Sequence, residues 1–232
     1  MDACALADSL LPSKSNWAEE RVELFATLSL EGAVPPCGDA NAEPEPKEWK
    51  GEPALCLLAL QAEACQDSTA ALQWLETRAR AFPESDGAWL ALAGARFRAL
   101  DPDPDSGLPF NEDLPPAARL ALADQVLELL AHAGDPGNRG VLLLRSAAYE
   151  QRQHSRLALA SPETPEERRE VLLYRADAMM AWMWLDKVCA LEGLPRCASP
   201  NTHRCCPLPP LTQAEVDADP QLEAELARES AR

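Results

Sequence analysis

The apolar and polar positions of this chain recur at helical spacing rather than with the strict alternation of a strand. Between Glu52 and Leu100 the pattern predicts one helical hairpin followed by the first helix of another. Asp67 or Ser68 caps the second helix, and Ser85 or Asp86 caps the third. The predicted helices cover 17–30, 52–64, 69–82, 86–100, 115–133, 138–160 and 165–193.

The segments between these helices carry the residues that interrupt regular structure. A proline- and acid-rich linker covers 31–51, an acidic proline-broken loop covers 101–114, and Gly134 is expected to end the preceding helix as a left-handed cap. Residues 212–232 form a polar, helix-capable tail that Pro220 interrupts. We therefore expect three parts: an N-terminal helix and linker (1–51), a helical-repeat domain (52–194), and a Cys/Pro-rich segment with its tail (195–232).

Composition strengthens the helical prediction and limits the partners. Hydrophobic residues make up 47 % of the chain, but Ala and Leu dominate them and Ile is absent, which favours an all-α fold. The net charge is −17, so nucleic acids and anionic membrane surfaces would be repelled. The acidic charge either serves solubility or attracts a basic partner. No apolar run approaches the roughly 20 residues of a membrane span.

A repeat of 34 residues links the first hairpin to the helix that follows it. When 52–67 is aligned with 86–101, a large residue, a leucine and a small residue fall at the same places in both segments. These residues are Leu55, Leu58 and Ala59 in the first segment and Trp89, Leu92 and Ala93 in the second. A two-helix unit of this period resembles the tetratricopeptide repeat. The second helix also fits the family through Ala71, Leu75 and Pro83, whereas Arg78 and Arg96 depart from its pattern.

The resemblance implies antiparallel hairpins stacked as a short solenoid, with a concave surface for a protein or peptide partner. By position, Trp74, Trp89 and Arg96 are the residues expected to line that surface. No catalytic or nucleotide-binding motif is visible in the sequence, so we expect a non-enzymatic interaction or assembly module without a cofactor. One alternative is an acidic inhibitor or immunity-type protein that binds a basic partner, and another is a cysteine-based metal or redox carrier.

Cysteine usage bears on the compartment. We expect disulfide-stapled terminal segments, with pairing inside an N-terminal and a C-terminal group of four, and therefore an exported, periplasmic or secreted protein whose signal peptide has been removed. A reduced cytoplasmic protein is the alternative. Cys197, His203, Cys205 and Cys206 could bind zinc or cuprous copper, but their spacing is poor and disulfides are the preferred interpretation. The eight cysteines are Cys4, Cys37, Cys56, Cys65, Cys189, Cys197, Cys205 and Cys206.

Overall fold

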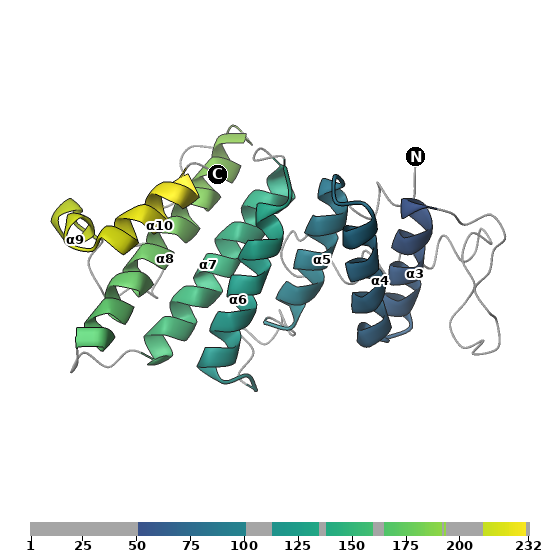
Figure 1. Cartoon of the computed structure of the whole chain (residues 1–232), viewed down its shortest axis with the longest axis horizontal. Helices are drawn as coiled ribbons and strands as arrows, with labels where there is room; N and C mark the ends of the chain where they lie inside the picture. The colour runs from purple at the N-terminus through teal and green to yellow at the C-terminus, as the bar shows by residue number, and fades with distance from the viewer. Residues whose placement is uncertain are drawn as a thin grey trace. The chain divides into compact units, whose positions relative to one another are not determined.

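The structure, a computed structural model, describes residues 51–100, 113–134, 138–159, 165–191, 193 and 211–230 (Figure 1). Of these residues 84 % are helical and none is in a strand, which confirms the all-α prediction for this part of the chain. The helices are α3 (Glu52–Ala64), α4 (Ser68–Ala81), α5 (Asp86–Arg98), α6 (Pro116–Ala131), α7 (Arg139–Leu159), α8 (Pro165–Leu191), α9 (Gln213–Asp217) and α10 (Pro220–Ser230).

The chain divides into two compact units. In the first, the described residues are 51–96 and His132–Gly134, so it holds α3, α4 and most of α5. The second is built from Phe97–Ala131 and Asp135–Arg232, and it holds α6 to α10. The predicted helix at 17–30 lies outside the described residues, as do residues 101–112 of the predicted acidic loop at 101–114.

Local sequence signals explain how the first hairpin turns. The Asp67 carboxylate accepts a hydrogen bond from the backbone N–H of Ala70 at 2.9 Å, so Asp67 is the cap that begins α4. Gln66 adopts a positive φ of 61°, which reverses the chain between α3 and α4. The hydroxyl of Ser85 accepts from the N–H of Ala88 at 3.3 Å and caps α5 in the same way.

Small side chains form the packing surface of the first unit. α3 packs against α4, and the alanines at the contact are fully buried, as is the apolar face of α5. Small residues let helix backbones approach closely, and leucines fill the remaining space. The most deeply buried of these residues are Ala59, Leu60, Leu75, Ala79, Ala88 and Ala93.

Gly134 does not cap α6 in the left-handed conformation that the sequence suggested. The positive-φ glycines among the described residues are Gly51 and Gly193, and α6 ends earlier, at Ala131. Gly134 instead donates its backbone N–H to the Asp86 carboxylate at 2.6 Å. A Cβ atom at Gly134 would lie 3.3 Å from that carboxylate oxygen, so the close approach to Asp86 favours glycine here. Gly193, two residues after the end of α8, is the glycine that adopts a positive φ after a helix.

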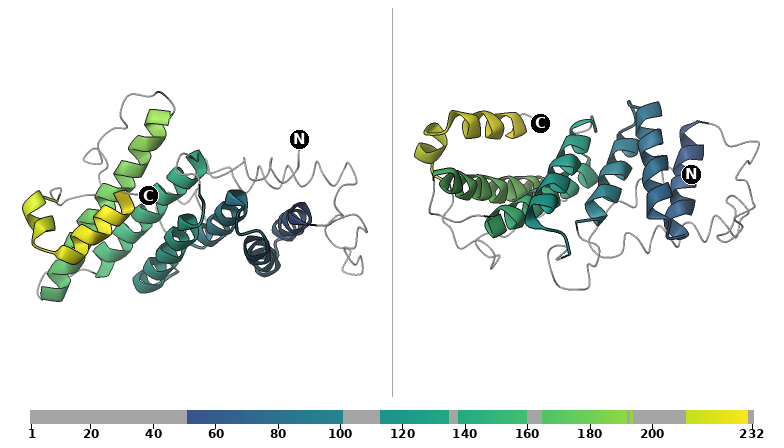
Figure 2. Two further views of the ribbon diagram at one scale, coloured as in Figure 1. Left: turned by 45° about the horizontal axis from the view of Figure 1, so that its top comes forward. Right: turned by 60° about the horizontal axis from the view of Figure 1, so that its bottom comes forward.

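The second unit stacks three long helices in chain order. α6 packs against α7, and α7 packs against α8, with α10 lying on α8 (Figure 2). α7 is central, so residues on several of its faces are buried, including polar ones such as Arg152 and Arg156. Large apolar residues of this core are Val126, Leu130, Leu144, Tyr149, Tyr174 and Trp184.

The C-terminal tail forms two helices, and Pro220 is the first residue of the second. Thr212 begins α9 with a capping box, in which its hydroxyl accepts from the N–H of Glu215 and Glu215 accepts from the N–H of Thr212. Pro220 cannot continue α9 but suits the first turn of α10, whose N-terminal amides are capped by the Asp219 carboxylate. Leu222 is 1 % exposed, so this tail is packed onto the second unit.

No helix in the described part of the chain is long and apolar enough to cross a membrane.

Candidate protein-interaction surfaces

Trp89, predicted to line a partner groove, already makes contacts inside the first unit. Its ring stacks on His132, with centroids 4.5 Å apart and planes inclined by 24°. Its indole N–H donates to the backbone carbonyl of Pro83 at 2.8 Å. The side chain remains half-buried, so part of it stays accessible to solvent. Trp89 is therefore fixed in orientation, as a rigid anchor on a binding surface would be.

Arg96 is tied to α4 through Glu76. The Arg96 guanidinium donates to the Glu76 carboxylate at 2.6 Å, which ties α5 to α4. Glu76 also pairs with the exposed Arg80 at 3.2 Å. Trp74 lies two residues before Glu76 and is half-buried. The structure thus brings Arg96 to the helix that carries Trp74, and both side chains are partly accessible. Residues two positions apart face different sides of a helix, so the pair with Glu76 does not place Arg96 beside Trp74.

The helical pattern of the sequence does not predict the buried arginine of the first unit. Arg78 is 2 % exposed, and its guanidinium donates twice to Glu52 Oε1, at 3.1 and 2.7 Å. The Ser85 hydroxyl donates to the same carboxylate oxygen. Glu52 therefore links the start of α3 to the end of α4 and to the cap of α5. The signal in the sequence was Arg78 itself, which occupies a position where the repeat pattern expects a small residue.

The charged core of the second unit was also missed. Asp177 on α8 is buried and accepts a hydrogen bond from Arg156 Nε at 2.8 Å. Arg152 Nε lies 3.5 Å from the other Asp177 oxygen and 3.2 Å from the carboxylate of Asp124 on α6. A buried arginine must be paired to offset its desolvation. Ion pairs therefore link α6, α7 and α8.

Two cations flank the buried Trp184. The Arg145 guanidinium carbon lies 4.8 Å and the Lys187 Nζ 3.9 Å from its ring centroid. Desolvation, and then the positive charge of Arg145, lower the pKa of Lys187. With Met180 also buried, the Met/Trp-rich segment of α8 serves mainly as core, and Met179 is its exposed member.

Burial likewise lowers the pKa of His154 on α7, which favours its neutral form.

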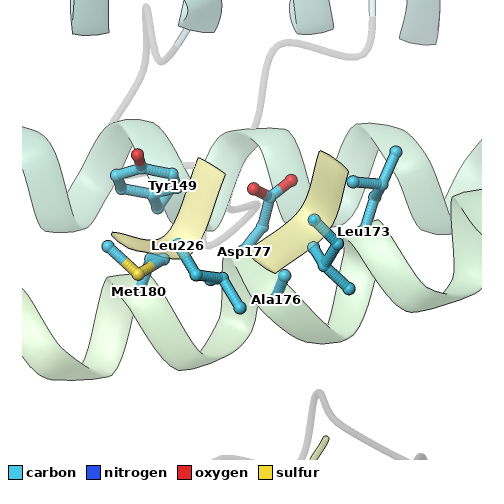
Figure 3. Close-up of a pocket in the computed structure, with 7 residues that line it drawn as sticks. Tyr149, Leu173, Ala176, Asp177, Met180 and Leu226 are labelled. Atoms are coloured by element: carbon cyan, nitrogen blue, oxygen red, sulfur yellow. The ribbon is translucent and has the colours of Figure 1, made fainter. Parts of the chain in front are cut away.

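The tail docks on α8 through an apolar stripe. Leu222 packs with Leu173 and Ala176, and Leu172, Leu211 and Leu226 lie at the margins of this contact. A small cavity remains beneath α10, lined by Tyr149 of α7, by α8 residues and by Leu226 (Figure 3). This cavity has space for about one water molecule.

Two arginines of α8 hold the acidic residues of the tail. Arg175 donates to both oxygens of Glu215, at 2.6 and 2.8 Å. Arg169 donates to Asp219 at 3.3 Å and to the Gln221 side chain at 2.7 Å. The hydrogen bond from Arg175, followed by those from Thr212, lowers the pKa of Glu215 to about 2. The N–H of Leu222, helped by Arg169, lowers the pKa of Asp219.

The described cysteines differ in exposure. Cys56 is 1 % exposed and Cys189 is buried, whereas Cys65 follows the end of α3 and is exposed. Cys4, Cys37, Cys197, Cys205 and Cys206 lie outside the described residues, as does His203, so the possible zinc or copper cluster lies there too. Within the described ranges no group of three or more His, Cys, Asp or Glu is placed to hold a metal ion.

Comparison of the chain with protein-family models, curated proteins and solved structures found no match. The residues and their geometry are therefore the basis for the function proposed below.

Proposed function

We propose that this chain is a non-enzymatic protein-interaction module, in which a helical-repeat surface bearing Trp74, Trp89 and Arg96 binds a protein or peptide partner. The proposal draws its main support from the packing of helices on their sequence neighbours, α3 on α4 and α6 to α8 in chain order. Arrays of this kind present extended surfaces whose side chains come from several helices. The resemblance of 52–100 to the tetratricopeptide repeat supports the same interpretation.

The fixed position of Trp89 and the residue types of the surface suit it to binding. Trp89 is fixed by His132 and the Pro83 carbonyl, so little side-chain entropy would be lost when a partner covers it. Aromatic residues and arginine also dominate the binding energy of protein interfaces.

Photo-crosslinking from position 74 tests this function. A photoreactive amino acid replaces Trp74 in one variant and its exposed neighbour Gln73 in the control, and both proteins are exposed to an extract of the source cells. We expect position 74 to give a discrete protein adduct and position 73 to give none. Equal labelling from both positions, or labelling from neither, would contradict the proposed surface.

The salt dependence of binding then distinguishes the proposed function from the acidic-inhibitor hypothesis. A complex built on apolar and aromatic contacts should survive 1 M salt, in which surface charge interactions are screened beyond about 3 Å. An acidic inhibitor that recognises a basic partner should lose most of its affinity under the same conditions. If no adduct forms when the crosslinking is carried out in 1 M salt, the inhibitor hypothesis is favoured.

We further propose that disulfides staple the terminal segments and that the protein works in an oxidising compartment, periplasmic or extracellular. The even number of cysteines in the chain, eight, supports the proposal. Non-reducing mass spectrometry tests it: four disulfides would lower the mass of the eight-cysteine chain by about eight hydrogens. Fully reduced cysteines, with or without bound zinc or copper, would overturn it and favour the thiol-based carrier.

A further inference from the structure

The tail helix α10 has the features of a bound peptide rather than of a core helix. It buries Leu222 and half-buries Leu226, four residues later, while Gln221, Glu223, Ala224, Ala227 and Arg228 are exposed. An isolated helix of 11 residues is marginal in water, so its fold depends on the surface beneath it. The docked segment is therefore an acidic amphipathic helix held along one narrow stripe.

The face of α8 beneath the tail matches that chemistry. Leu173, Ala176 and Met180 lie at helical spacing along one side of α8, and Tyr149 of α7 lies beside them around the cavity (Figure 3). Arg169 and Arg175 stand beside this apolar stripe and pair with Asp219 and Glu215. A leucine stripe flanked by two arginines is suited to a helix with leucines four residues apart and acidic residues beside them.

We propose that this α8 face is a binding site for an acidic amphipathic helix of a partner protein, and that residues 211–230 of the chain itself occupy it as a tethered competitor. Among the described residues of α10, Leu222 and Leu226 make this contact, and the cavity beside them has space for about one water molecule. A partner helix with more apolar residues on this face would gain contacts that α10 lacks. The site lies in the second unit and does not depend on the role proposed for Trp74, Trp89 and Arg96.

The affinity for an added peptide depends on how strongly the chain's own α10 competes for the site. Because α10 and α8 belong to the same chain, α10 binds as an intramolecular ligand, for which an effective concentration on the order of 1 mM is typical. A free peptide with a Kd of about 50 μM would then bind the intact protein about 20-fold more weakly than a chain whose own helix is released. Release of α10 should therefore raise the affinity for a peptide added in trans.

Fluorescence anisotropy with a labelled peptide of residues 211–230 tests the proposal on the full-length chain. Three proteins are compared: the wild type, a release variant with Leu222→Ala and Leu226→Ala, and a control with Glu223→Ala and Arg228→Ala on the exposed face of α10. We expect the release variant to bind the peptide at least 10-fold more tightly than the wild type, and the control to behave as the wild type. No binding to a folded release variant at 100 μM peptide would overturn the proposal and make α10 a purely structural cap.

A charge exchange distinguishes specific binding from a sticky exposed face. Arg175→Glu in the release variant should weaken binding of the wild-type peptide at least 10-fold, and a peptide with Glu215→Arg should restore it. Because restoration requires a folded site, misfolding cannot imitate it; failure of the exchanged peptide to restore binding would contradict the proposed pairing. Concentration-dependent dimers of the wild type that disappear in the release variant would replace the external partner with a second copy of the chain.

Discussion

The two compact units hold their helices together in different ways. In the first unit, small residues such as Ala59, Ala79 and Ala93 bring backbones together, and the Arg78–Glu52 pair has its carboxylate partly in solvent. In the second unit, Arg156 and Asp177 meet between helices, with both side chains almost fully buried. The first unit therefore depends on close packing, whereas the second depends on charges that must stay paired.

The largest expected effect is in the charged core of the second unit. Asp177→Ala should lower the free energy of unfolding by about 3–5 kcal/mol, because Arg152 and Arg156 would lose a buried carboxylate. Urea unfolding followed by circular dichroism measures it. Asp124→Ala is the matched control: this carboxylate faces the same Arg152 but is 54 % exposed, so the loss should stay below about 1 kcal/mol. Equal losses in the two variants would show that burial of Asp177 does not matter.

The pair at the rim of the first unit should matter less. Glu52→Gln keeps the shape of the side chain but removes the charge that faces the buried Arg78, so we expect a loss of about 1.5–3 kcal/mol. Glu76→Gln, which weakens the more exposed pairs with Arg80 and Arg96, should cost less than about 1 kcal/mol in the same urea experiment. A loss for Glu52→Gln as large as that for Asp177→Ala would remove the distinction between the two units.

The sequence predicted the first unit more fully than the second. Small and large residues at a fixed period, Pro53 at a first turn and Asp67 as a cap act locally, so they identify α3 and α4 to within a residue or so. The tail was predicted to be helical and to break at Pro220, which the structure confirms.

What the sequence did not reveal depends on contacts between distant residues. Arg152 and Arg156 are as polar as any exposed arginine, and only their burial against Asp177, more than 20 residues away, gives them a structural role. The same holds for Arg175, which meets Glu215 40 residues later. Helical spacing identifies which residues share a face of one helix, but it does not state which face a later segment covers.

A double-mutant cycle between Trp89 and His132 asks whether the stacked ring stabilises the first unit. The coupling energy from Trp89→Ala, His132→Ala and the double variant should be about 0.5–1.5 kcal/mol, as for other aromatic pairs. Thermal or urea unfolding supplies the four values. No coupling would mean that the stack contributes nothing to stability and that Trp89 is held only by its bond to the Pro83 carbonyl.

The smallest expected effect is the acid dependence of the docked tail. The pKa of Glu215 is lowered from 4.5 to about 2, chiefly by Arg175, so its contact contributes fully above pH 4.5 and is lost as the pH falls toward 2. The lowered pKa of Asp219 adds a contribution of the same sign. Hydrogen exchange of 213–230, corrected for the intrinsic rate, should show protection that is constant from pH 7 to 5 and declines below pH 4. Glu215→Gln should reduce this acid-dependent loss to the share of Asp219, and protection that persists unchanged to pH 2 in the wild type would show that the apolar stripe alone holds the tail.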